Sequence, residues 1–337
     1  MASENGIPTD GTMALPGKRQ HSGGFIRALL TSRIGKTSKW VGPTFVLIFL
    51  LLSVSTDVGL GHLLQDYDPV ATLVLCFGMV IGFFLMVNST GLKAIFNKGR
   101  RDWQDILLLN LSTAGSWAGL FFALRYFEPA MAISFIHLIG PVVTLALEPW
   151  FGNHKKPSGL ELVSAFGIVA GMVFLGIITS HGKSGVGAIS NAGFLVGTLM
   201  SLLAGISVVC NTLFSRRVAG KGWSTSEVMT VRFYALALFA LCACSPNAIQ
   251  PLLNASALLP IALIACLGII VPLYTLQLGI ERTDPLVVAL LLTNSPLATI
   301  LLQNVDQRLS PAVFSVVGIG VCACFSTLGV IARIGNK

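Results

Sequence analysis

Charged residues are scarce in this chain of 337 residues: Asp, Glu, Lys and Arg make up 11% of it, and hydrophobic residues make up 54%. A soluble domain carries about 25% charged residues. The scarcity of charge and the mean hydropathy of +0.80 therefore exclude an ordinary soluble protein and indicate a polytopic membrane protein. The net charge of +8 does not suggest a nucleic-acid partner, because the basic residues lie between apolar runs, where membrane orientation explains them.

Motifs for several kinds of chemistry are also missing. The sequence has no Walker A loop, which argues against ATP-driven transport by this chain, and no H-E-x-x-H or G-x-S-x-G pattern. The seven cysteines lie in apolar runs and never take the C-x-x-C spacing of a zinc or redox site. We therefore expect no metal, no cofactor and no enzymatic activity. The segment "HLLQD", from His62 to Asp66, is only superficially similar to an acyltransferase His–Asp pair.

Long apolar runs are what the chain has in abundance. A helix needs about 20 apolar residues to cross the hydrocarbon core of a bilayer. Ten runs meet or approach this length, at 41–62, 70–88, 105–124, 130–150, 160–178, 192–214, 226–244, 258–280, 285–303 and 311–332. We therefore predict an all-α integral membrane protein with ten transmembrane helices.

The basic residues alternate between the two sides of these runs. Eighteen of the 22 Lys and Arg residues precede the first run, follow every second run, or lie at the C-terminus. Because cytoplasmic loops carry an excess of Lys and Arg, the bias predicts a multi-pass protein of the inner or plasma membrane with both termini cytoplasmic.

Residues 1–40 are expected to form a cytoplasmic tail. The first 24 residues are polar and rich in Gly, Pro, Ser and Thr, which predicts disorder. In "FIRALLTSRIGKTSK", residues 25–39, apolar side chains recur at helical spacing between Arg and Lys. This segment is either a short interfacial helix or a basic linker.

The sequence also repeats itself weakly. The segments 127–177 and 283–330 each have an acidic residue and Pro near their start and a second Pro mid-helix (Pro141 and Pro296). Each then makes a short Pro- and Ser-containing turn and enters a Gly-rich helix. The chain then divides into two five-helix units, 41–178 and 192–332. Five is odd, so the two units must have opposite orientations, and such inverted repeats place the substrate near the bilayer midplane between them.

These features resemble the EamA-type repeat of the drug/metabolite transporter superfamily over about 41–332. "GFLVGTLMSLLAGISVVCNTLFSRRV" is similar to the start of the family's second repeat, and "TVRFYALAL" is similar to its Arg-bearing seventh helix. Two positions depart from the family: the second helix lacks the matching Arg, and Asn153 stands where a Glu is frequent. The resemblance implies a carrier with a central cavity lined mainly by helices 1, 3, 4, 6, 8 and 9. It also implies substrates such as amino acids, nucleotide sugars, other metabolites or toxic compounds, many of them moved outward.

Two ionisable residues interrupt the apolar runs. Burying such a residue in a spanning helix costs about 2.5–3.5 kcal/mol on insertion scales, so each calls for a partner or a transport pathway. Asp57 and His137 fall at similar depth, and we predict that they carry protons, singly or as a pair, with His137 also able to bind substrate. The alternatives are a His137 hydrogen-bonded between helices and an Asp57 at the membrane interface.

Other polar and aromatic residues are candidates for the cavity wall. The predicted cavity residues are His137, Asn294, Trp117, Tyr274, Asn211 and Gln277. Asn294 lies two residues before Pro296 and is nearly the repeat counterpart of His137. Buried amides also serve simply as hydrogen-bonding links between helices, an alternative that holds for Asn110 and Asn211. Arg232 is expected to be structural and to reach the inner interface along its aliphatic stem.

Together these observations predict a secondary transporter that works by alternating access, with or without proton coupling, as a monomer or homodimer. A small metabolite such as an amino acid is the leading substrate and export the favoured direction. Multiply charged phosphates would need several Lys or Arg in the cavity. Multidrug efflux is the main alternative, and a membrane interaction protein without transport is a more distant one.

Overall fold

A computed structural model describes residues 40–151, 156–181, 189–303 and 313–335. Ten helices in these ranges are long and apolar enough to cross a membrane. They correspond one to one with the ten predicted runs, so the prediction of an all-α multi-pass membrane protein is confirmed at this level. The predicted tail helix at 25–39 lies outside the described residues.

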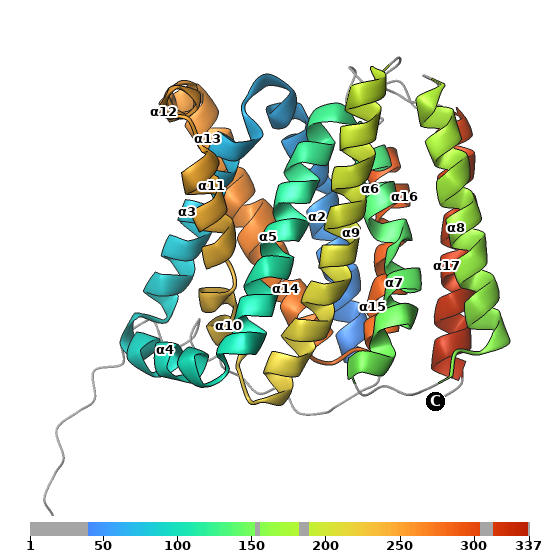
Figure 1. The fold of residues 1–337 in the computed structure, drawn as a ribbon, viewed down its shortest axis with the longest axis horizontal. Coiled ribbons are helices and arrows are strands. Elements are labelled where there is room, and N and C mark those ends of the chain that lie inside the picture. The colour runs from blue at the N-terminus through green and yellow to red at the C-terminus, as the bar shows by residue number, and fades with distance from the viewer. Residues whose placement is uncertain (1–39, 152–155, 182–188, 304–312, 336–337) are drawn as a thin grey trace, which may run out of the picture. The chain divides into compact units, whose positions relative to one another are not determined.

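Several spans are built from more than one helical segment (Figure 1). In chain order the spans are α2 (Val41–Asp66), α3 (Pro69–Val87), α5 (Trp103–Tyr126), α6 (Pro129–Leu138) with α7 (Gly140–Leu147), α8 (Gly159–Ser180), α9 (Asn191–Gly220), α10 (Thr225–Val231) with α11 (Tyr234–Ala243), α13 (Ala255–Leu263) with α14 (Val271–Ile280), α15 (Pro285–Leu292) with α16 (Ser295–Gln303), and α17 (Val313–Gly335). Shorter elements connect them: α4 (Leu92–Arg101), α12 (Pro246–Ile249), and the 3-10 turns Ser89–Gly91, Glu148–Phe151 and Gln250–Leu253.

Proline explains three of the interruptions. Pro141 follows the break between α6 and α7, and Pro296 follows the break between α15 and α16, because proline lacks an N–H and clashes with the carbonyl four residues earlier. Between α13 and α14 the chain forms a π-helical segment, Ile264–Ile270, which is followed by Pro272. The carbonyl of Gly268, four residues before Pro272, is taken up by the Thr56 hydroxyl of α2 at 3.1 Å.

The fourth interruption, at Arg232 and Phe233 between α10 and α11, has no proline. The side chain of Asn110 from α5 bridges it instead. Its Nδ2 donates to the Val231 carbonyl at 2.7 Å, and its Oδ1 accepts from the Ala235 N–H at 3.1 Å. Asn110 therefore supplies the partners that a continuous helix would have supplied.

Helix ends follow local signals. Ser158 with Glu161, and Ser224 with Glu227, form capping boxes at the starts of α8 and α10. α9 runs six residues past the predicted boundary at 214, because the basic residues there end the apolar run without interrupting the helix. It stops just before Gly222, whose φ of 84° suits a residue beyond a helix end.

The spans of the two halves pack against each other. α5 lies along α9, α14 lies along α2, and α8 lies along α17. α6 also packs on α9, and α16 on α2. One hydrophobic core, which includes Phe77 and Phe127 of the first half and Phe233 of the second, runs through both halves.

Glycine pairs contribute unequally to this packing. A Cβ on Gly119 of α5 would lie 2.6 Å from the Met200 carbonyl oxygen of α9, so only glycine permits this approach. The pairs Gly167/Gly171 and Gly193/Gly197 are also in close contact with neighbours. Gly119 belongs to the pair Gly115/Gly119. In the fourth Gly-x-x-x-Gly pair, Gly78/Gly82 of α3, a Cβ added to either glycine would meet no described atom within 4 Å.

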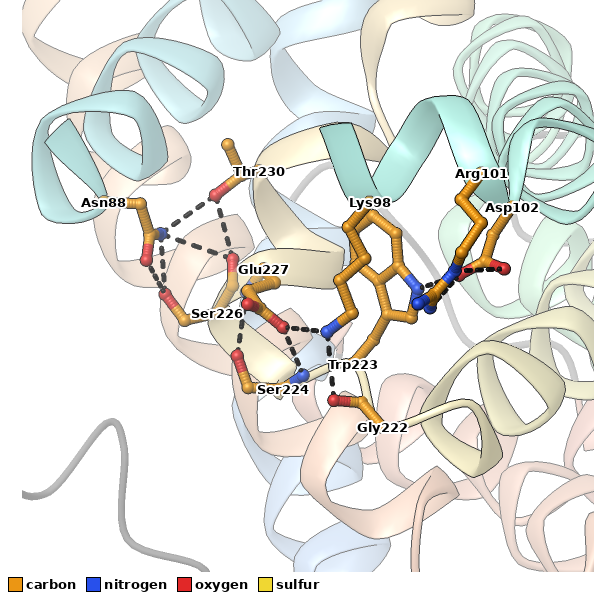
Figure 2. A network of polar contacts seen from close by, with 10 residues as sticks. All are labelled: Asn88, Lys98, Arg101, Asp102, Gly222, Trp223, Ser224, Ser226, Glu227 and Thr230. Carbon is orange, nitrogen blue, oxygen red and sulfur yellow. Dashed lines mark hydrogen bonds and ion pairs between the residues drawn. The ribbon is translucent and has the colours of Figure 1, made fainter. Parts of the chain in front are cut away.

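α4 lies outside the ten apolar runs and was not predicted from the sequence. It lies at the lower end of the spans in Figure 1, near the start of α10. Figure 2 shows how polar contacts hold it there: Lys98 of α4 forms a 2.8 Å ion pair with Glu227 and donates to the Gly222 carbonyl at 3.0 Å. The Trp223 indole donates to Asp102 at 2.8 Å, and Asp102 also pairs with Arg101 at 3.0 Å.

Candidate functional site

A cavity lies between the two halves of the chain, with an empty volume of about 790 Å³ that includes its opening. The first half contributes wall residues from α2, α5 and α6, and the second half from α9, α14, α15 and the π-helical segment. These are the six spans that the resemblance implies, and Arg232 is an additional contributor from the break between α10 and α11. The polar and charged wall residues are Ser53, Thr56, Asp57, Ser116, His137, Asn211, Thr212 and Arg232; most of the others are aliphatic or aromatic.

Asp57 projects from α2 into this cavity. Its exposed fraction is 6%, and it makes no hydrogen bond or ion pair with any residue that the structure describes. The neighbouring Thr56 fixes this part of α2 against the π-helical segment through its bond to the Gly268 carbonyl. Asp57 is thus a carboxyl group that faces a cavity and has no partner in the described part of the chain, and it does not lie at the end of its helix, which continues to Asp66.

His137 lies in the last turn of α6, just before the break. Its Nδ1 is buried and has no hydrogen-bond partner among the described residues. His137 also lines a second, smaller cavity, with an empty volume of about 270 Å³ that includes its opening, together with residues of α7, α9 and α15. His137 therefore borders both cavities, as do Ile136, Val208, Thr212 and Leu292. It lines the main cavity with Asp57, but no ion pair joins the two side chains.

Trp117 forms part of the cavity wall on α5 and belongs to an aromatic group. Its ring meets Phe77 edge-on at 4.9 Å and Phe121 at 6.1 Å between centroids. Phe77 in turn lies 5.4 Å from Phe233, beside the break after α10. Such edge-to-face contacts fix the orientation of the Trp117 indole that lines the cavity.

Asn211 and Gln277 converge on Arg232. Arg232 Nη2 donates to Asn211 Oδ1 at 2.5 Å, and Nη1 donates to Gln277 Oε1 at 3.2 Å. Asn211 and Arg232 line the cavity, whereas Gln277 is fully buried behind them. The expectation that Arg232 reaches the membrane interface is wrong: the side chain is 3% exposed and points to these inward partners.

Asn294 and Tyr274 are not among the residues that line the main cavity. The break after α15 turns Asn294 toward α17, where its Nδ2 lies 3.5 Å from Ser326 Oγ. The same Nδ2 lies 3.3 Å from the carbonyl oxygen of Leu290 in α15. Tyr274 of α14 packs, partly buried, against the hydrophobic core. The structure therefore does not bring Asn294 together with His137, its counterpart in the sequence repeat.

Arg232 is the residue whose position sequence reasoning missed. The segment "TVRFYALAL" places an arginine within an apolar run, and such a costly position indicates a structural or functional role. The direction of its side chain depends on the break and on α9 and α14, which are far away in the sequence.

Comparisons with known proteins bear on the fold. No family model matches the chain, and no curated protein matches its sequence. Nineteen solved chains are similar in structure. One of them, whose description reads only "Crystal structure of protein", has 18% sequence identity and a TM-score of 0.58 over 88% of this chain and 94% of that chain. At this identity the likeness shows that the chain shares its fold with a solved protein, and the EamA-type resemblance stays a prediction.

Proposed function

We propose that this chain is a secondary transporter of the EamA type that moves a small organic metabolite by alternating access. The cavity carries this proposal. It lies among membrane-length spans, and its wall residues come from both halves of the chain. It contains two ionisable side chains, Asp57 and Arg232, that have no charged partner among the described residues. Polar groups at such a cost inside a membrane protein are typical of a solute or ion pathway.

The packing of the spans supports two repeats of five helices. If the spans are numbered 1 to 10 along the chain, each span of the first repeat corresponds to the span five places later. α5 and α9 are spans 3 and 6, and their counterparts are spans 8 and 1, which are α14 and α2. These two helices also pack together. The contacts of α6 with α9 and of α16 with α2 form a second such couple. α8 and α17, spans 5 and 10, are each other's counterparts. This is the pattern expected of inverted repeats, in which one half rocks against the other around a central site.

The proposed orientation has both termini in the cytoplasm of a cell whose inner or plasma membrane holds the protein. Besides the bias in basic residues, three tryptophans support a membrane interface at that side: Trp40, Trp103 and Trp150 are 62%, 57% and 84% exposed. They lie at the ends of α2, α5 and α7, where tryptophan commonly meets lipid headgroups. Because the cavity is complete within one chain, a monomer or a homodimer can serve as the working unit.

Amino acids and related metabolites are the proposed substrates, with export favoured by analogy with the family. Multidrug efflux is the second candidate, and the aromatic and aliphatic walls around Trp117 favour it, since many toxic compounds are apolar. The polar groups from Asp57, His137, Asn211 and Arg232 favour the first.

Transport by purified protein in proteoliposomes tests the proposal. Labelled amino acids and cationic drugs would be offered with and without a pH gradient, and we expect accumulation or counterflow of at least one amino acid. If no solute of either panel moves above the protein-free control, the transporter proposal fails. In the same assay Asp57→Asn and His137→Gln test proton coupling. If a variant retains transport driven by the pH gradient, the residue it replaces does not carry the coupling proton.

A further inference from the structure

The guanidinium of Arg232 is a buried cation surrounded by neutral groups. It lies at the break between α10 and α11, is 3% exposed, and lines the main cavity. Its contacts are Asn211 Oδ1 at 2.5 Å, Gln277 Oε1 at 3.2 Å, Thr113 Oγ1 at 3.4 Å, the Met229 sulfur at 3.7 Å, and the Phe233 ring with its centroid 5.5 Å away. None of these partners is a carboxylate, and no described residue forms an ion pair with Arg232.

A chain of hydrogen bonds fixes the direction of these partners. The Thr113 hydroxyl donates to the Leu109 carbonyl at 2.7 Å and accepts from Asn211 Nδ2 at 2.6 Å. The amide oxygen of Asn211 is thereby left to face Arg232. The network orients the guanidinium without neutralising its charge. An arginine has five N–H donors. The four hydrogen-bond contacts, to Asn211, Gln277, Thr113 and Met229, engage four of them, one only weakly with sulfur, and no described residue takes the second donor on Nη2.

Burying a charge is costly unless the group is paired and hydrogen-bonded. Arg232 faces a cavity, and Asp57 of α2 is a carboxyl group on the same cavity wall that has no partner among the described residues. The two side chains form no ion pair with each other. The cavity thus presents one isolated cation and one isolated carboxyl group, separated within otherwise mostly apolar walls.

From this geometry we propose that Arg232 binds the carboxylate of the transported solute. The open Nη2 donor, together with the Nη1 N–H that meets only the Met229 sulfur at 3.7 Å, suits an oxyanion with two acceptor atoms. A single arginine matches a single carboxylate, and Asp57 offers a partner for an ammonium group on the same molecule. This inference rests on the proposed transport function and names its substrate class: amino acids with apolar side chains, anchored by their carboxylate.

Binding by the purified wild-type protein tests the carboxylate anchor without requiring transport. The probes are the twenty amino acids and a series of aliphatic and aromatic monocarboxylates, each compared with its carboxamide, for example L-phenylalanine with L-phenylalaninamide. We expect at least one carboxylate to raise the melting temperature and to bind about tenfold to a hundredfold more tightly than its amide. Equal binding of carboxylates and amides across the series, or no binding of any carboxylate, overturns the proposal. A shift produced equally by chloride at the same concentration also overturns it, because the site would then be a general anion site.

Variants assign the effect to Arg232. Arg232→Met removes the charge, and Arg232→Lys keeps the charge without the two-pronged geometry. We expect the carboxylate preference to vanish in Arg232→Met and to be reduced in Arg232→Lys, with both proteins monodisperse by size exclusion. Arg333→Lys serves as the matched control, since Arg333 is an equally buried arginine that does not line the main cavity, and it should keep the preference. A full preference in Arg232→Met refutes the assignment. If Arg232→Met does not fold, Arg232→Lys and the wild-type probe pairs still decide.

The two proposals fail separately. Carboxylate binding that depends on Arg232, combined with no solute movement in proteoliposomes, would refute transport and retain the binding site. Transport of a solute without a carboxylate, unaffected by Arg232→Lys, would retain transport and refute the carboxylate anchor.

Discussion

Single buried side chains form hydrogen bonds with backbone groups that would be unpaired at the breaks in two of the spans. Asn110 replaces the helical hydrogen bonds of Val231 and Ala235, and Thr56 takes the carbonyl that Pro272 frees at Gly268. In hydrocarbon an unpaired backbone group finds no water, so each such residue permits a backbone conformation that would otherwise be too costly. The break that Asn110 supports is the one that turns Arg232 toward the cavity.

Replacing Asn110 by alanine should therefore destabilise the protein. Two buried backbone groups lose their partner, and each unsatisfied group costs about 1–3 kcal/mol, so we expect a loss of about 2 kcal/mol or more. Thermal unfolding in detergent measures it. Ser112→Ala is the control, because the Ser112 hydroxyl bonds only within its own helix, to the Leu109 carbonyl at 3.1 Å. Equal melting temperatures for the two variants would contradict the bridging role.

Asp102 predicts a pH dependence at the α4 end of the protein. Hydrogen bonds from Arg101, and then from the Trp223 indole, lower the pKa of Asp102 below its ordinary value of 3.8. A carboxyl group with a lowered pKa in the folded state stabilises the protein above its unfolded pKa, and that contribution disappears as the pH falls through the folded pKa. The stability advantage of the wild type over Asp102→Asn should thus be full at neutral pH and shrink between about pH 5 and about pH 3.

Melting temperatures of both proteins across this range provide the test. Asp66→Asn is the matched control, because the Asp66 side chain is 65% exposed. If the difference between wild type and Asp102→Asn stays constant with pH, the charged form of Asp102 does not contribute to stability.

At the scale of elements, contacts between helices depend on which small residues face each other. The same Gly-x-x-x-Gly spacing occurs in α3 and in α5, yet only the pair in α5 meets another helix closely among the described residues. The spacing identifies a small face on a helix and leaves its partner undetermined.

Gly119→Ala should accordingly destabilise the protein, whereas Gly82→Ala should not. At Gly119 the added methyl would lie 2.6 Å from the Met200 carbonyl oxygen and 2.9 Å from the Ala204 Cβ, and such overpacking costs about 1–3 kcal/mol. At Gly82 an added methyl would meet no described atom within 4 Å, and alanine favours the helix over glycine by up to about 1 kcal/mol. Thermal unfolding in detergent measures the stability of both variants. A Gly119→Ala protein more stable than Gly82→Ala would contradict the close α5–α9 contact.

Across the whole molecule, one arginine connects the ends of four helical segments. Arg333 in the last turn of α17 pairs with Glu148 at 2.9 Å, with Glu161 of α8 at 3.5 Å and with Asp284 at the start of α15 at 3.4 Å. Arg333 is 4% exposed, so these pairs are shielded from water. They join the end of the first proposed repeat to the second.

Removing this connection should have a large effect. In Arg333→Met the acidic side chains lose a buried partner, and breaking a buried pair costs about 3–5 kcal/mol. Arg333→Lys should be intermediate, since lysine cannot reach three carboxylates with a planar fork. Arg125→Met is the comparison: Arg125 is exposed and bonds only to the Leu64 and Tyr67 carbonyls among its described contacts. A melting temperature for Arg333→Met no lower than that for Arg125→Met would exclude the connecting role.

The sequence by itself determined the number and approximate limits of the spans and the breaks next to Pro141 and Pro296. These features are local: bilayer thickness sets the length of an apolar run, and proline acts on its own turn of helix. It also pointed to Asp57, His137, Trp117 and Asn211, because polar or aromatic groups among small and apolar residues stand out.

Only the tertiary structure decided where those groups point. Lipid demands an apolar surface and so does a packed helix interface, so hydropathy does not separate the face toward lipid from the face toward a cavity. Asn294 turns to Ser326 of α17, and Arg232 turns inward to Asn211 and Gln277, because partners more than 20 residues away in the chain determine each direction.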